Sequence, residues 1–313
     1  MIKILKTLFN TFKLQIIGVI NLTLPIIAIA YYYPLFLQNN WGISLCSIAI
    51  GLYVFFLNYK ATKKNENAFL FIPTGACKEE FEKTIQECNL NPQTINLRYG
   101  YSNEGLAMTI FSTIIIDPLI WHDLDEDPEA LKVKGILATH IIPTLSDTQK
   151  NRINKTKEAF TSGAQRFIFK HELGHIFYNY SNKKLFLMSI LGAIATWSGI
   201  YTTMVTLKYL SIFAIPFGMF VGGLNDLFLM FLSNLFFKAQ EEKKSDIFAA
   251  YYSSKADIND AADFFEKHQM ILDANPEPNN IFSKFPSVLM TGHPHGIIRS
   301  RYLREFTKKN MLS

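Results

Sequence analysis

The sequence contains few cysteines, no internal repeat and no nucleic-acid-binding pattern. Three of its 313 residues are cysteine, at positions 46, 77 and 88, and no pair of them has the spacing of metal ligands. A four-thiolate metal site is therefore excluded, and the low count fits a reducing compartment. The net charge is +5, but we find no basic face with interleaved aromatic residues, so we expect no nucleic-acid partner. The lack of a repeat argues against a transporter.

Long apolar runs are the main feature that the sequence does contain. Hydrophobic residues make up 49% of the chain and gather in four runs, each of roughly the 20 residues that cross a bilayer as a helix. A cleaved signal peptide is the alternative for the first run, but it would have a shorter apolar core and a small-residue cleavage site, which we do not find. Short separators predict two transmembrane hairpins. The runs are Leu14–Leu37, Trp41–Asn58, Leu185–Thr206 and Ile212–Phe237.

Lysine residues mark the outer ends of both hairpins. They precede the first and third runs and follow the second and fourth, whereas the short turns hold only Lys208. By the positive-inside rule, both termini and the long polar segments face the cytosol. We therefore expect a multi-pass membrane protein that is mainly α-helical (α+β), with four transmembrane helices and a cytosolic domain in two parts. The predicted parts are the hairpin 1–59, the cytosolic part 60–184, the hairpin 185–237 and the cytosolic part 238–313.

The fourth run carries an acidic residue at a depth where ionisable groups are costly. Asp226 follows Asn225, and Gly218 and Gly222 lie nearby as small residues that suit close helix packing. One interpretation is a polar contact or a proton path near the functional site. The other is a helix that tilts or begins later and so brings Asp226 to an interface. The sequence leaves both open.

The polar segments contain patterns for a strand and several helices. The Ile-, Thr- and Phe-rich stretch Ala107–Asp117 predicts a strand. Asp125–Thr161 is polar and contains Pro128 and Pro143, so we expect irregular structure with short helices there. Prolines and asparagines at 275–280 interrupt the pattern before the last helix. Helices are predicted for Ser162–Tyr180 leading into the third run, for Lys238–Ser253, for Asp257–Leu272, and from Gly296 onwards.

The segment His171-Glu172-Leu173-Gly174-His175 is an H-E-x-x-H motif. Residues four apart share one face of a helix, so both imidazoles can bind one metal ion. The glutamate next to the first histidine can then take a proton from the water that the metal activates. The alternative is a pair of histidines on an amphipathic helix with no metal.

A catalytic zinc site needs a third protein ligand and an open position. Glu242 and Asp246 are four residues apart in a predicted helix. Glu242 can complete a His-His-Glu set, and Asp246 can accept a hydrogen bond from a ligand imidazole and so fix its tautomer. Glu241 is an adjacent alternative, and a charged run of this kind is also typical of a solvated helix face. The apolar stretch Ile247–Tyr252 favours an Asp246 that faces inward.

These motifs resemble those of the HtpX group of membrane gluzincins, relatives of the CAAX prenyl endopeptidases. The H-E-x-x-H motif is followed by Glu242–Ala249, which is similar to the E-x-x-A-D-x-x-A motif of this group, with Ser245 in place of alanine. Near the C-terminus, His293-Pro294, Arg299 and Leu303 are similar to its H-P-x-x-x-x-R-x-x-x-L segment. The placement of the four runs is also similar, so the resemblance covers nearly the whole chain.

The resemblance implies an activity and a set of residue roles. It implies a zincin-like peptidase domain with a small β-sheet and one Zn²⁺ per chain. The reaction would be hydrolysis of peptide bonds in membrane or misfolded proteins, at the cytosolic face of a bacterial inner membrane. The expected partners are polypeptide substrates and the lipid bilayer. The implied roles are zinc ligands for His171, His175 and Glu242, general base for Glu172, partner of a ligand imidazole for Asp246, and oxyanion or substrate-backbone contacts for His293 and Arg299, with His295 as the alternative to His293.

The chain also departs from the family pattern. Lys170 stands where a small residue is usual, 238–240 lacks the usual Ser-Arg pair, and 121–160 is longer than the family needs. These departures bear on substrate choice. A CAAX-type processing peptidase is one alternative, although four spans do not form a large enclosed chamber. An inactive zinc-binding adaptor or signalling protein is another, but the retained Glu172 argues against it. A transporter built around Asp226 is a third, disfavoured by the lack of repeats.

Overall fold

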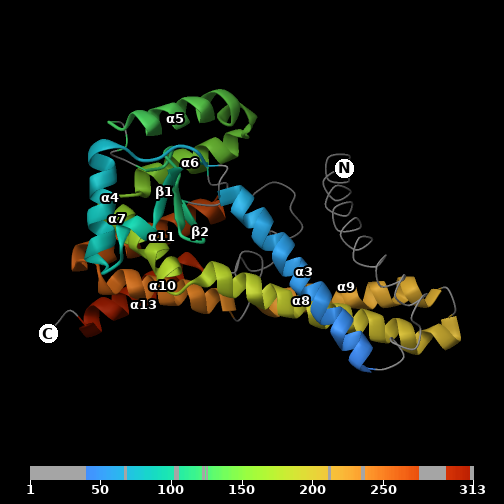
Figure 1. Ribbon diagram of the computed structural model, residues 1–313. Coiled ribbons are helices and arrows are strands. Elements are labelled where there is room, and N and C mark those ends of the chain that lie inside the picture. The colour runs from blue at the N-terminus through green and yellow to red at the C-terminus, as the bar shows by residue number, and fades with distance from the viewer. Residues whose placement is uncertain are drawn as a thin grey trace. The chain divides into compact units, whose positions relative to one another are not determined.

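The computed structural model describes residues 40–66, 69–101, 106–121, 124, 126–210, 213–233, 237–274 and 294–310. The described residues are mainly helical and include one three-stranded sheet, as the sequence predicts. The first apolar run, Leu14–Leu37, and the predicted site residue His293 lie outside them. The chain divides into two compact units, one of residues 1–60 and 185–232 and the other of residues 61–184 and 233–313 (Figure 1).

The first unit contains long apolar helices. Within the described residues, two helices are long and apolar enough to cross a membrane, over Trp41–Lys64 of α3 and Tyr180–Leu207 of α8. They coincide with the second and third apolar runs of the sequence. The fourth run overlaps a further helix. The bounds are α3 Asn40–Glu66, α8 Tyr180–Leu210 and α9 Ala214–Ser233.

Small residues allow α8 and α9 to approach each other closely. A Cβ added to Gly222 would lie 3.2 Å from the carbonyl oxygen of Ala195 and 3.3 Å from the Cα of Gly199, so larger residues would push the helices apart. One polar contact joins the same pair of helices: the Asn225 amide donates to Ser198 Oγ at 2.8 Å. Asp226 has no ion-pair or hydrogen-bond partner among the described residues, so the predicted polar contact is not found there.

The second unit contains the sheet, whose strands are ordered β1-β3-β2. Strand β1 (Asn96–Tyr99) is parallel to β3 (Thr113–Ile116), and β2 (Ala107–Ile110) is antiparallel to it. The prediction of one strand over 107–117 is therefore wrong. The chain reverses at Phe111, which has a left-handed φ of 52° and whose N–H donates to Ser181 Oγ at 3.0 Å. Strand β3 has a neighbouring strand on each side, and all four of its residues are buried.

Helix α7 (Ser162–Phe177) carries the H-E-x-x-H motif and lies beside the sheet (Figure 1). Thr161 starts the helix, because its hydroxyl accepts the N–H of Ala164. The predicted helix to Tyr180 ends early, at Phe177, since Asn179 adopts a left-handed φ of 55° and separates α7 from α8. Most of α7 is buried because β2, α4 (Gly75–Glu87), α10 (Ala239–Tyr251) and α11 (Lys255–Ala274) all pack against it.

The short helices predicted within 125–161 are confirmed, and they take up most of the segment for which irregular structure was also predicted. They are α5 (Pro128–His140) and α6 (Asp147–Ala159). The Asp127 side chain caps α5 with proline following it, and Ser146 and Gln149 form a reciprocal capping box at α6. These prolines lie at helix starts, where proline is tolerated, and so do not disrupt the segment.

The remaining helices complete the core of the second unit. The helices predicted after 238, after 257 and from 296 are confirmed. Gly296 begins the last of them, and a Cβ there would overlap the carbonyl oxygen of Phe265, so α13 packs tightly on α11. The bounds are α4 Gly75–Glu87, η1 Pro92–Thr94, η2 Ile142–Thr144, α10 Ala239–Tyr251, α11 Lys255–Ala274 and α13 Gly296–Asn310.

His268 on α11 is a half-buried histidine that links two helices. Its Nδ1 lies 3.2 Å from Thr156 Oγ1 on α6, and its ring stacks on Phe264 with centroids 5.4 Å apart. Burial, together with the positive charges of Arg152 and Arg299, lowers the pKa of His268 to about 4. The neutral imidazole is therefore the form that the fold accommodates.

This histidine should make the second unit sensitive to acid. An unfolded histidine has a pKa of about 6.5, so as pH falls from 6.5 to 4 the unfolded chain binds a proton before the folded one does. The free energy of unfolding should fall by about 2–3 kcal/mol across that window from this group alone. Thermal unfolding of the detergent-purified protein at pH 7 and at pH 4.5 measures it. His268→Phe should lose less stability than the wild type between pH 7 and pH 4.5. The control His140→Gln, at an exposed position, should lose as much as the wild type. Equal losses in His268→Phe and wild type would contradict the prediction.

Candidate metal centre

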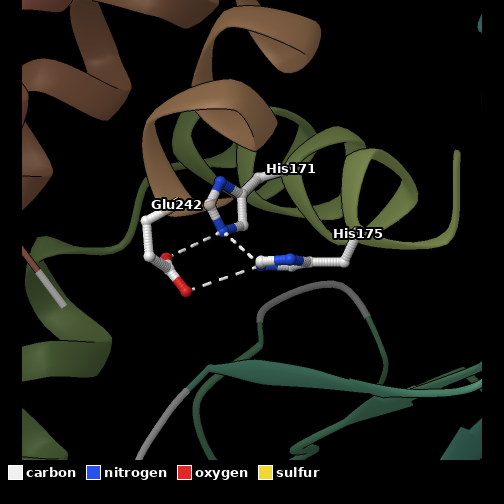
Figure 2. A group of neighbouring side chains, drawn as sticks. All are labelled: His171, His175 and Glu242. Atoms are coloured by element: carbon white, nitrogen blue, oxygen red, sulfur yellow. Dashed lines mark hydrogen bonds and ion pairs between the residues drawn. The ribbon is translucent and has the colours of Figure 1, made fainter. Parts of the chain in front are cut away.

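Two helices of the second unit bring the three predicted metal ligands together. His171 and His175 lie on α7 and Glu242 on α10, and Figure 2 shows the two imidazoles and the carboxylate turned toward one another. The two Nε2 atoms are 3.1 Å apart, and they lie 3.3 and 3.6 Å from the two carboxylate oxygens of Glu242. The side chains of His171 and Glu242 are 4% exposed and that of His175 is 16% exposed. The group could bind a metal ion.

The close approach of α7 and α10 depends on the glycine inside the motif. A Cβ on Gly174 would lie 2.9 Å from the Cα of Ser245, closer than real side chains come to a backbone. Because position 174 has no side chain, the backbone of α10 can lie directly against α7. Glu242, one turn before Ser245 on α10, then faces both histidines.

Hydrogen bonds hold the outer nitrogen of each imidazole. His171 Nδ1 lies 2.7 Å from Asp246 Oδ1, and His175 Nδ1 lies 3.2 Å from Ser245 Oγ. An imidazole whose Nδ1–H donates outward presents the lone pair of Nε2 on its other side. With Nδ1 protonated in both rings, both lone pairs point toward the Glu242 carboxylate, an arrangement that favours a cation between these groups. Ser245, which stands where the resembled family has alanine, thus has a contact of its own in the site.

Asp246 is the most connected residue of the site and is fully buried. Its two oxygens accept Arg299 Nε at 2.9 Å and an Arg299 terminal nitrogen at 2.6 Å, and it also accepts the hydroxyl of Tyr302. Burial alone would raise the pKa of Asp246, but Arg299 and His171 outweigh it and lower the pKa to about 2. The carboxylate is therefore charged, and Arg299 neutralises it.

The same charges act on the two histidines. Burial disfavours a charged His171, but Asp246 at one nitrogen and Glu242 at the other raise its pKa to about 9. Burial and the neighbouring His171 lower the pKa of His175. The carboxylates of Asp246 and Glu242 therefore favour positive charge at this position, which a divalent cation can supply.

The donor spacing is close to that of a tetrahedral metal site. Bonds of about 2.0–2.1 Å at tetrahedral angles place ligand atoms about 3.3 Å apart. The two nitrogens are 3.1 Å apart, each lies 3.3 or 3.6 Å from a different oxygen of Glu242, and one donor atom of each residue lies within 4.8 Å of the others. Three protein ligands leave a fourth position for water or substrate, as catalytic sites do. Among the described residues, the side chains of His171, His175 and Glu242 form the group that could hold a metal ion.

Glu172, the predicted base, is held by a residue that sequence reasoning missed. Its Oε2 accepts a hydrogen bond from Thr109 Oγ1 at 2.7 Å, and its own carbonyl lies 3.2 Å from the same hydroxyl. Thr109 belongs to β2, the strand at the edge of the sheet. No sequence signal pairs it with residue 172, because 63 positions separate them. Tyr302 was also missed, although it follows Arg299 by one helical turn, a spacing that places both on one face.

The other predicted residues have the following places. Arg299 donates to Asp246, and one of its terminal nitrogens also lies 3.4 Å from His171 Nδ1. Its guanidinium carbon lies 3.7 Å from the centroid of the Phe265 ring. Its predicted contact with an oxyanion stays a prediction, as does that of His293. The backbone carbonyl of His295 accepts the N–H of Arg299 at the start of α13. Glu241 is not in the ligand group, so Glu242 is the glutamate that faces the histidines.

Lys170, which departs from the family pattern, connects the motif helix to two neighbours. Its buried Nζ donates to the carbonyl of Tyr252 at 2.6 Å and lies 3.4 Å from Glu87. Tyr252 ends α10, where the unpaired carbonyls of a helix favour a positive charge. The lysine therefore holds the C-terminal end of α10 against α7, whereas the ligand Glu242 lies in the first turn of α10.

Loss of the Asp246 charge should weaken metal binding. Asp246→Asn leaves Arg299 and the Nδ1 of His171 without their anionic partner, so the imidazole loses its fixed orientation. The affinity for Zn²⁺ should fall about 10–100-fold, measured by competition with a chromophoric chelator. The matched control is Asp263→Asn, which removes another aspartate–arginine pair between α11 and α13 but at the surface. That variant should bind Zn²⁺ as the wild type does. Equal affinities in all three proteins would contradict the prediction.

Comparisons with protein families, with curated proteins and with solved structures find no match for this chain. What the site can do is argued from its own geometry. Two imidazoles and a carboxylate converge, and hydrogen bonds hold the Nδ1 atom of each imidazole. A second carboxylate, that of Glu172, lies on α7 together with the two histidines. The described residues thus contain a candidate metal centre with a candidate base beside it.

Proposed function

We propose that this protein is a zinc-dependent endopeptidase of the membrane, of the HtpX type. One observation supports this above the others: the two histidines of the H-E-x-x-H motif and Glu242 converge at ligand distances in a buried site. The donor set of two imidazoles and one carboxylate favours zinc among the available divalent ions. Glu172, between the two histidines in sequence, supplies the base that hydrolysis needs.

The residues of the site divide the work of peptide hydrolysis. A bound zinc ion would polarise the scissile carbonyl and lower the pKa of a water molecule toward 7. Thr109 occupies Oε2 of Glu172, so the other carboxylate oxygen is free to accept a proton from the attacking water. Glu172 then gives this proton to the nitrogen of the leaving amine as the C–N bond breaks. Asp246 and Ser245 hold the imidazoles in place throughout.

Four membrane spans in two hairpins are proposed for the rest of the chain. Helices α3 and α8 have the length and composition of spans. We add α9, which overlaps the apolar run 212–237, and the run 14–37 as the remaining two. The lysines that flank these runs orient the peptidase domain and both termini toward the cytosol. Cytosolic segments of membrane proteins and misfolded membrane proteins are the proposed substrates.

The peptidase activity should depend on the base and on the metal. Glu172→Gln keeps the size and the hydrogen bond of the side chain but cannot accept the proton, so cleavage should fall by at least about 10²-fold while Zn²⁺ binding persists. The measurement is cleavage of casein by detergent-purified protein, first under chelator and then with zinc added back. Glu82→Gln, at an exposed position on α4, is the matched control and should remain fully active.

Other outcomes would point elsewhere. Equal residual activity in wild type and Glu172→Gln would indicate a contaminating protease and contradict the proposal. Zinc bound at one ion per chain with no cleavage of casein, nor of a panel of unfolded membrane proteins, would favour an inactive metal-binding adaptor. Cleavage confined to prenylated C-terminal peptides would favour a CAAX-type processing peptidase.

The membrane topology can be tested with reporter fusions in a bacterial host. Alkaline phosphatase is active only outside the cytosol, so it should be active when inserted in the turns at 38–40 or 208–211 and inactive after Ser313. Green fluorescent protein after Ser313 should fluoresce, because it matures in the cytosol. Active phosphatase at the C-terminus would contradict the proposed orientation, and activity at both turns and the C-terminus would contradict the hairpins.

A further inference from the structure

Tyr180 carries a buried hydroxyl that has no hydrogen-bond partner among the described residues. The whole residue is 8% exposed, so the phenol is also withdrawn from water. A buried donor without an acceptor costs about 1–3 kcal/mol, and such groups are uncommon in folded proteins. Phenylalanine would fill the same space without that cost. The hydroxyl therefore calls for an acceptor that the described residues do not supply.

The phenol lies beside the metal centre. Tyr180 is the first residue of α8 and follows the left-handed Asn179, which turns the chain back toward α7. Its ring meets the His175 ring edge to face, with centroids 5.5 Å apart and planes at 67°. The negative charges of Glu241 and Glu242 also act on the phenol. Tyr180 is thus placed against one metal ligand and within electrostatic reach of another.

Tyr180 contacts the most exposed of the three ligand side chains. The His175 side chain is 16% exposed, against 4% for His171 and 4% for Glu242. We therefore expect an incoming molecule to approach the metal position along His175. The Arg299 guanidinium is already engaged on the other side, where it donates to both oxygens of Asp246.

The chemistry of a phenol selects the missing partner. Phenols ionise near pH 10, so the hydroxyl is a neutral donor at pH 7. A metal cation cannot accept its hydrogen bond, and the phenol binds most strongly to an oxygen that carries negative charge. The proposed reaction creates such an oxygen, because the scissile carbonyl gains charge when water attacks it.

We propose that Tyr180 is a catalytic residue that donates a hydrogen bond to the carbonyl oxygen of the scissile peptide bond, and this inference rests on the proposed peptidase function. The water oxygen bonds to the carbonyl carbon, the π pair moves to the carbonyl oxygen, and Glu172 takes the water proton. The phenol hydrogen-bonds to the charged oxygen and keeps its own proton. When the C–N bond breaks, its electron pair goes to nitrogen, which receives the proton from Glu172, and the C=O bond forms again.

The test compares Tyr180→Phe with Tyr178→Phe, a control that removes the hydroxyl of a half-buried neighbour in the same turn. Tyr180→Phe should lower kcat for casein about 10²–10³-fold and leave KM and Zn²⁺ affinity within about twofold of wild type. Its melting temperature should be equal to or higher than that of the wild type, because the substitution deletes an unpaired buried donor. Tyr178→Phe should keep the wild-type kcat.

Each contrary result has a distinct meaning. Wild-type kcat in Tyr180→Phe, with Glu172→Gln inactive, overturns the role of Tyr180 and leaves the peptidase intact. Weaker Zn²⁺ binding or a lower melting temperature in Tyr180→Phe also overturns it, since the hydroxyl would then support the metal ligands or the fold. Loss of the difference between wild type and Glu172→Gln is the failure of the proposed function, and the Tyr180 proposal falls with it.

Discussion

The burial of one charged carboxylate, that of Asp246, is the constraint on which the rest of the site depends. A fully buried anion is tolerated only when its oxygens are paired, and here Arg299, Tyr302 and His171 pair them. These partners come from α13 and α7, while Asp246 itself lies on α10. Three helices distant in sequence are therefore joined at one charge, and the orientation of a metal ligand is set at the same point.

The remaining contacts of the site follow from this junction. With α10 held against α7 through Gly174, Glu242 faces both histidines, and Ser245 reaches the outer nitrogen of His175. Lys170 binds the other end of α10. The arrangement is rigid where the ligands are fixed. The Tyr180 hydroxyl finds no hydrogen-bond partner among the described residues, as expected where a substrate must supply the complement.

The chemistry of the centre was largely readable from local spacing. Helical periodicity places residues 171 and 175 on one face and residues 242 and 246 on another, so the ligand set and the imidazole partner could be predicted before any fold was known. Capping signals at 127 and 146 were also present, although the prolines of that segment favoured an irregular interpretation. The single strand predicted over 107–117 failed because a left-handed Phe111 gives no sequence signal of a turn.

The sequence by itself determined which side chains can bind a metal, where the long apolar helices lie and which segments are polar, because these properties repeat along neighbouring residues. Only the tertiary structure decided which distant groups meet. It paired Thr109 with Glu172, turned Arg299 onto Asp246, and placed the Tyr180 ring against His175 with its hydroxyl unpaired among the described residues. Such pairings depend on how strands and helices pack across tens of residues, and periodicity carries no information at that range.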